Sequence, residues 1–252
     1  MVLPAPASIA ARTLAALIAA EEIGEPHVVL APTPVWMSDR DPLRAETAEA
    51  MTTLGWRDRF GRLEREVAAT LTVLCRPTTE FYGWITRDGQ TVGVLAATIG
   101  KEAVLAVRQP DSTIRLSNVH SERLAEQLVA QTPDIAPGRA KPLTFSPAEL
   151  RATNRTGRVR TAAGVGLRPA SPEVRRAKAL IALPTTGAGE LYTAKRDHTG
   201  RRLADDQPVS YVDSVDGRYA ERALPGGQVS VRPVGRADLV AELQAKHREL
   251  RA

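Results

Sequence analysis

Residues 80–131 alternate short runs of β-forming residues with residue pairs that favour tight turns. The turn signals are Asp88-Gly89, Gly100-Lys101 and Pro110-Asp111-Ser112. Glycine accepts the positive φ of a hairpin turn, and the other two signals suit reversals. The runs rich in Val, Ile, Leu and Thr are Thr91–Ile99, Ala103–Arg108 and Thr113–Val119. With the opening Glu80-Phe81-Tyr82, the stretch predicts four strands. A helix is expected next, with Ser121 as its N-cap and Leu124 and Leu128 on its apolar side.

The same succession of patterns occurs a second time near the C-terminus. The matched segments are Glu80-Phe81-Tyr82 with Glu190-Leu191-Tyr192, Ile114–Val119 with Val229–Val234, and Leu124 and Leu128 with Leu239 and Leu243. From the last strand onward the spacing between the two copies is constant. We interpret this as an internal duplication of a ββββα unit, with chance similarity between hairpin-rich stretches as the alternative.

The duplication predicts an α+β fold with quasi-twofold symmetry, because two such units are too few for a solenoid. We expect one domain over residues 1–252, with half one at 1–135 and half two at 143–252. The strands of both halves are expected to form a central antiparallel sheet. Apolar spacing and capping signals predict helices at 8–20, 42–54 and 63–74, and after Ser146 and Ser171. An extended piece is expected at 27–36, and a long mobile loop at 151–170.

Length and composition are those of an ordinary soluble protein. The chain has 252 residues, of which 43% are hydrophobic, and no apolar run reaches the length of a membrane span. The first residues lack the basic start of a secretory signal, so we expect a cytoplasmic location. The single cysteine, Cys75, excludes an internal disulfide and predicts a buried, inert thiol.

The net charge of +5 and the pI of about 9.7 raise the question of an acidic partner. Arginines cluster in the expected loop, at positions 151, 155, 158, 160 and 168. They would suit phosphate contacts, so the alternative function is a basic nucleic-acid-binding module acting through residues 151–168. No aromatic residue interleaves them to stack on bases, however. We therefore expect a solvated loop and no nucleic-acid partner.

No pattern of reactive residues predicts catalysis. The histidines His27, His120, His198 and His247 lack a second ligand at metal-site spacing. The sequence contains no G-x-S-x-G motif, and Gly187-Ala188-Gly189 lacks the other residues of a dinucleotide or phosphate loop. We expect no enzyme activity, no cofactor and no metal.

The strand at 91–99 is apolar on both of its faces. Val94 and Ala96 point to one face, whereas Leu95 and Ala97 point to the other. Such a strand must be covered on both faces. Either the chain's own helices cover both, or part of the second face is left for a partner chain.

In the order of its motifs, most of the chain resembles the EspG chaperones of type VII (ESX) secretion in actinobacteria. The matching motifs are Leu54-Gly55, Cys75-Arg76-Pro77, Glu80-Phe81-Tyr82-Gly83-Trp84, Arg175–Leu180, Thr186–Glu190, Val209–Asp213 and Asp216–Tyr219. The resemblance implies a non-enzymatic cytosolic chaperone with a central antiparallel sheet flanked by two helical bundles. It also implies binding to the hydrophobic tip of the PPE subunit in PE–PPE secreted heterodimers, which keeps them soluble and directs them to export.

The resemblance supplies no short binding motif, so we choose contact residues from the apolar pattern. The candidates are Trp84, Val94, Leu95 and Ala97 in the first sheet module and Leu239, Leu243 and Leu250 in the C-terminal helix. Core packing is the alternative role for each of them. The sequence also leaves a homodimer open.

Overall fold

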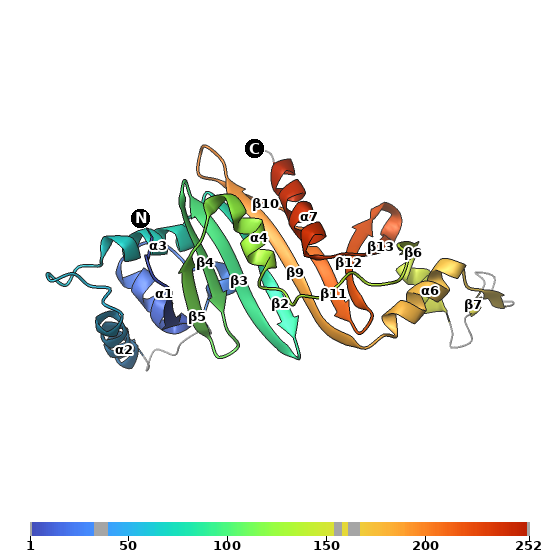
Figure 1. The fold of residues 1–252 in the computed structure, drawn as a ribbon, viewed down its shortest axis with the longest axis horizontal. Helices are drawn as coiled ribbons and strands as arrows, with labels where there is room; N and C mark the ends of the chain where they lie inside the picture. Colours follow the sequence, from blue (N-terminus) through green and yellow to red (C-terminus); the bar gives the residue numbers. More distant parts are fainter. Residues whose placement is uncertain (1, 33–39, 154–157, 161–166, 251–252) are drawn as a thin grey trace. The chain divides into compact units, whose positions relative to one another are not determined.

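The computed structural model describes residues 2–32, 40–153, 158–160 and 167–250. The chain forms two compact units, each assembled from separate stretches of sequence (Figure 1). Unit 1 comprises Met1–Pro133, Glu190–Pro208 and Val240–Ala252, and unit 2 comprises Asp134–Gly189 and Val209–Leu239. These units differ from the contiguous halves 1–135 and 143–252 expected from the sequence, because two later stretches join unit 1.

In unit 1, neighbouring strands follow the order β1-β5-β4-β3-β2-β9, and β10 pairs with β9. The strands are β1 (Ala7–Ala10), β2 (Thr79–Arg87), β3 (Gln90–Ile99), β4 (Glu102–Arg108), β5 (Thr113–Asn118), β9 (Thr185–Arg196) and β10 (Arg202–Ala204). Strands β2 to β5 pair antiparallel in sequence order. Asp88 and Gly89 have φ of 50° and 76°, positive as a type I′ turn requires. The predicted first hairpin is therefore confirmed.

Helices cover both faces of the unit 1 strands. They are α1 (Ala11–Ala20), η1 (Val28–Leu30), α2 (Arg40–Thr53), α3 (Arg65–Cys75), η3 (Ser121–Arg123) and α4 (Leu124–Val129), with the end of α7 (Arg236–Glu249). Leucines of α1 and α3 share one core with Leu95 and Ala97 of β3. Val94 and Ala96 point the opposite way, and α4 packs there on β2, β3 and β4 (Figure 1). The chain's own helices therefore cover β3 on both sides.

In unit 2, the strand order is β9-β11-β12-β13-β6, and β7 and β8 form a separate pair. The elements are β6 (Leu143–Phe145), α5 (Pro147–Ala152), β7 (Arg158–Arg160), β8 (Leu167–Pro169), α6 (Pro172–Ile181), β11 (Val209–Ser214), β12 (Gly217–Leu224), η4 (Pro225–Gly227) and β13 (Gln228–Pro233). The core joins Leu143 and Phe145 of β6 to Val174 and Ala177 of α6. Ser146 and Ser171 accept N–H hydrogen bonds as N-caps, which confirms both predicted helix starts.

The two units have the same order of strands. In unit 1, β1 pairs with the last strand of the β2–β5 meander. In unit 2, β6 pairs likewise with β13, the last strand of the succession β9, β11, β12 and β13. A helix follows each succession, α4 in one case and α7 in the other. This order is what an internal duplication produces, and a twofold axis relating the copies stays a prediction.

Several local expectations were wrong. Residues 8–10 belong to strand β1 rather than to a helix, because they pair with β5. Residues 28–30 form a 3-10 turn within the expected extended piece, whose residues 33–36 lie outside the described chain. Ser121 does not cap α4, since a 3-10 turn precedes that helix. The expected loop 151–170 includes the strand pair β7–β8, and its residues 154–157 and 161–166 are not described.

Candidate functional site

The structure places most of the predicted contact residues in the core. Val94, Leu95 and Ala97 are 0% exposed, and so are Leu239 and Leu243. A partner could not touch these side chains without displacing α3, α4 or α7. The choice of these five residues as contacts therefore does not fit this structure. Trp84 and Leu250 are half-buried and retain accessible surface.

Trp84 belongs to a group of three aromatic side chains on β2 and β9. The rings of Tyr82 and Tyr192 stack with centroids 5.3 Å apart. The Trp84 ring meets them edge-on, at 6.4 Å from Tyr82 and 5.9 Å from Tyr192. Tyr82 is buried, whereas Trp84 and Tyr192 are half-buried. Such edge-to-face and stacked pairs hold rings in fixed positions. Trp84 and Tyr192 therefore present ordered aromatic surface.

A buried carboxylate lies next to this aromatic group along β2. Glu80, two residues before Tyr82 on the same strand face, is 3% exposed. Its Oε1 accepts a hydrogen bond from Arg202 Nε at 2.6 Å, and Arg202 Nη2 lies 2.5 Å from the same oxygen. The Arg202 guanidinium also lies over the Tyr82 ring, 5.4 Å from its centroid. The ion pair thus connects β2 to β10, and Arg202 also contacts the Tyr82 ring of the aromatic group.

Opposing influences act on the pKa of Glu80. Burial alone would raise it, because the charged form loses solvation. The nearby His27 imidazole and the hydrogen-bonded Arg202 guanidinium outweigh burial, so the pKa of Glu80 is lowered. His27 Nε2 lies 3.6 Å from Glu80 Oε1. The carboxylate therefore stays ionised within the core.

Val28 adds accessible apolar surface to unit 1, beside the residue that packs on Gly93. It is 58% exposed in η1, which packs on β2, β3 and β4. Gly93, the cross-strand neighbour of Trp84, allows this approach. A Cβ on Gly93 would lie 2.7 Å from the Val29 carbonyl oxygen. The His27 ring also meets Tyr82, with centroids 4.6 Å apart. We call Val28, Trp84 and Tyr192 the aromatic surface of unit 1.

Helix α7 packs its last turns against unit 1. His247 Nδ1 lies 2.9 Å from Thr193 Oγ1, and the His247 ring is 5.1 Å from that of Phe81. Lys246 Nζ donates to Asp205 Oδ2 at 2.6 Å. Burial, followed by the charge of Lys195, lowers the pKa of His247. These contacts explain why α7 buries Leu243, and they leave Leu250 at the end as its accessible leucine.

Unit 2 has an apolar patch of its own. Ile181 at the end of α6 is 60% exposed, and Val215 in the β11–β12 turn is 65% exposed. The Val215 N–H donates to the Pro184 carbonyl at 3.2 Å, which holds the turn against the segment that follows α6. We call Ile181, Pro184 and Val215 the unit 2 patch.

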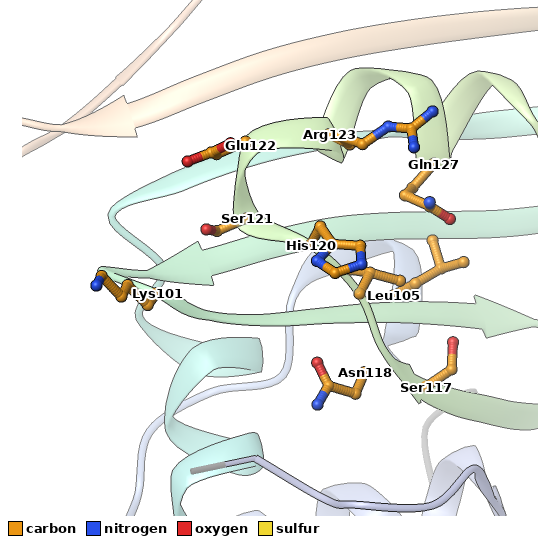
Figure 2. Close-up of a pocket in the computed structure, with 10 residues that line it drawn as sticks. Lys101, Leu105, Ser117, Asn118, His120, Ser121, Glu122, Arg123 and Gln127 are labelled. Atoms are coloured by element: carbon orange, nitrogen blue, oxygen red, sulfur yellow. The ribbon is translucent and has the colours of Figure 1, made fainter.

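A pocket of unit 1 is lined mostly by polar and charged residues. Figure 2 shows it between the β4–β5 strands and the chain leading into α4. Its volume is about 1100 Å³, and its lining includes Lys101, Ser117, Asn118, His120 and Arg123. Leu105 is a buried apolar residue at its floor. This lining suits solvent or a polar segment better than an apolar tip.

Other functional expectations gain no support from the described residues. Among them, no group of three or more His, Cys, Asp or Glu side chains could hold a metal ion. No helix in the described ranges is both long and apolar enough to cross a membrane. The side chains of residues 154–168 lie outside the description. Nucleic-acid binding through this arginine-rich segment, the alternative function, is therefore not tested by the described residues.

Val28, Tyr192 and the Glu80–Arg202 pair were not among the site residues predicted from the sequence. Tyr192 had a signal, because it answers Tyr82 in the duplicated pattern and the two rings stack. Glu80 also had one, since it shares a strand face with Tyr82 and Trp84. Val28 had no signal in the sequence, because its exposure depends on the packing of η1 over Gly93.

The chain was compared with known proteins. A model of the EspG family matches residues 10–245. Among solved structures, the Mycobacterium tuberculosis type VII secretion system chaperone EspG5, in complex with a PE25–PPE41 dimer, is similar in fold. The TM-score is 0.65 at 17% sequence identity, and the similarity covers 95% of each chain. No curated protein sequence matches the chain at a significant level.

Proposed function

Because the chain belongs to the EspG family, we propose that it is a cytoplasmic chaperone of type VII secretion. It binds the hydrophobic tip of a PE–PPE-type heterodimer, keeps the heterodimer soluble and directs it to export. The observation that carries the proposal is the family match over residues 10–245. The similarity in fold to EspG5, which is solved with a PE25–PPE41 dimer, supports it.

The client docks on the aromatic surface of unit 1. Val28, Trp84 and Tyr192 offer accessible apolar area beside a buried core. Each 100 Å² of apolar area removed from water contributes about 2.5 kcal/mol before the costs of association. Aromatic anchors are the residues that most often dominate such interfaces. Leu250, at the end of α7, stays a predicted contact at the edge.

The surface is ordered before the client arrives. Glu80 holds Arg202 against the Tyr82 ring, and the stacked tyrosines and Trp84 restrict one another. A rigid surface loses little side-chain entropy on binding, so more of the burial energy appears as affinity. The chaperone therefore acts by covering an apolar tip without changing its own fold.

The test is co-expression of tagged chaperone with a PE–PPE heterodimer encoded beside it, followed by pull-down. Val28→Asp places a charge in the proposed contact without opening the core, because Val28 is largely exposed. We expect this variant to lose client binding and client solubility while its melting temperature is unchanged. Trp84→Ala should also weaken client binding, as Val28→Asp does.

The matched control is Val215→Asp, which places the same charge in the unit 2 patch. If this variant loses the client and Val28→Asp keeps it, the docking surface lies in unit 2 and the aromatic surface is wrong. If client solubility does not depend on the chaperone at all, the proposed function itself fails.

A further inference from the structure

The connection between α2 and α3 carries an exposed aromatic residue at its tip. Phe60 is 67% exposed, and Arg59 and Arg62 stack on its ring at 4.7 Å and 5.3 Å from the centroid. Figure 1 shows this connection extending away from the strands of unit 1. We call residues 57–63 the Phe60 hairpin. Both guanidinium groups hold the ring by cation–π contacts and leave it largely exposed, so it can serve as an aromatic anchor in a protein contact.

The hairpin is held in one shape. Arg57 and Leu63 form an antiparallel bridge, and Gly61 has the positive φ of a tight turn. Asp58 Oδ1 accepts the N–H groups of Phe60 and Arg62 at 2.8 Å and 2.9 Å. Its Oδ2 accepts Arg62 Nε at 3.1 Å. A surface fixed in this way can enter a shaped pocket at little entropic cost. A membrane would not require such a fixed turn.

A groove of complementary chemistry lies at the base of the same hairpin. Its volume is about 620 Å³, and its lining is apolar except for Glu64, Glu66 and Asn118. The apolar walls come from residues 2–7, Leu54, Trp56 and Val67. Thr70 and Glu102 accept the N–H groups of Leu3 and Val2 and so hold the N-terminal wall in place. We call this the N-terminal groove.

The charges of the hairpin and the groove match. Among the described residues, Glu64 and Glu66 have no basic partner and Arg59 has no acidic one. The hairpin cannot fill its own groove, because Trp56 and Glu64 form its base and its rigid turn holds Phe60 away. A second copy of the chain, by contrast, supplies the ring and the arginine that the groove lacks.

We propose that two copies of this chain form a twofold dimer in which each Phe60 hairpin occupies the N-terminal groove of the other copy. The proposed twofold axis makes the contact twice, which closes the assembly at two copies. We expect the dimer to form reversibly as concentration rises.

The experiment is sedimentation velocity of the full chain over a wide concentration range. The wild type should pass from monomer to dimer, and Phe60→Ala should raise the dimer dissociation constant at least about tenfold, since each dimer loses two rings. Val215→Asp, on unit 2, is the control and should dimerise as the wild type does. A wild type that stays monomeric, or a dimer unchanged by Phe60→Ala, would overturn the proposal.

A charge exchange makes the test specific to this pairing. Arg59→Glu alone and the double variant Glu64→Arg/Glu66→Arg alone should each weaken self-association, because like charges then meet twice. An equal mixture of the two should form a heterodimer, because each contact again joins opposite charges. Failure of the mixture to associate would contradict the proposed pairing. Client pull-down by the Phe60→Ala variant separates this proposal from the chaperone function, since that variant should still bind client.

Discussion

Glu80 stabilises the aromatic surface through its ion pair with Arg202, which contacts the Tyr82 ring. Its pKa lies below the unfolded value of about 4.3, because His27 and Arg202 outweigh the effect of burial. Stability from this group is therefore complete above the unfolded pKa and is lost as pH falls through the lower folded pKa. At neutral pH, Glu80→Gln should lower the free energy of unfolding by about 1–3 kcal/mol, since Arg202 loses its charged partner.

Urea unfolding at neutral pH and at acid pH would check this prediction. The difference between wild type and Glu80→Gln should shrink on acidification. The control is Glu46→Gln, because Glu46 pairs with Arg12 at 2.8 Å on the surface. That exposed pair should contribute no more than about 1 kcal/mol. An equal Glu80→Gln effect at both pH values would show that its carboxylate is not stabilised by its neighbours.

At the scale of elements, sequence patterns predicted those strands and helices whose signals are local. Asp88-Gly89 fixed the first hairpin, and Ser146 and Ser171 cap α5 and α6 through their own hydroxyl groups. Strand β1 was missed because its conformation comes from pairing with β5, where Ile9 lies opposite Ile114. Apolar spacing over so few residues does not distinguish a strand from the first turn of a helix.

Gly83 determines how closely β2 and β9 approach within unit 1. A Cβ at this position would lie 2.2 Å from the Glu190 carbonyl oxygen and 3.0 Å from Leu191 Cα. Because both obstacles are backbone atoms, Gly83→Ala should cost about 3 kcal/mol or more, the upper range for overpacking. It should also reduce client binding, since β2 carries Trp84 and β9 carries Tyr192.

Gly89→Ala is the comparison for this prediction. Gly89 has φ of 76° but no atom within 4 Å of an added Cβ. The Gly89→Ala substitution should lower the free energy of unfolding by about 1–2 kcal/mol through backbone strain alone and leave client binding intact. Thermal unfolding and pull-down of both variants would check the difference. Equal client binding by the two would contradict the importance of the β2–β9 approach.

At the scale of the whole molecule, the sequence predicted the class of fold and the repeated order of strands but not which residues stay accessible. Val94 and Leu95 were correctly placed on opposite faces of one strand, yet both are buried. Whether a strand face is covered depends on how other elements pack, here α4 on the Val94 face and α1 and α3 on the Leu95 face. The buried ion pair of Asp213 with Arg218 in unit 2 likewise forms across a hairpin, at 2.6 Å. Its burial depends on packing that no local pattern reports.

The division of the chain into two units predicts which fragments can fold by themselves. Unit 1 needs Glu190–Pro208 and Val240–Ala252, which supply Arg202 to Glu80, Leu191 beside Gly83 and His247 beside Phe81. A fragment of residues 1–133 would leave β2 as an uncovered sheet edge with exposed apolar side chains. Such edges associate with other chains, so this fragment should aggregate when expressed alone.

Co-expression with residues 134–252 should restore soluble material, because the missing strand and helix then return from the second fragment. Size-exclusion chromatography and amide hydrogen exchange at β2 would check this outcome. A soluble fragment 1–133 with protected β2 amides would show that unit 1 folds without its later stretches. Rescue by the second fragment would instead show that unit 1 folds only when the strand and helix from residues 134–252 complete it.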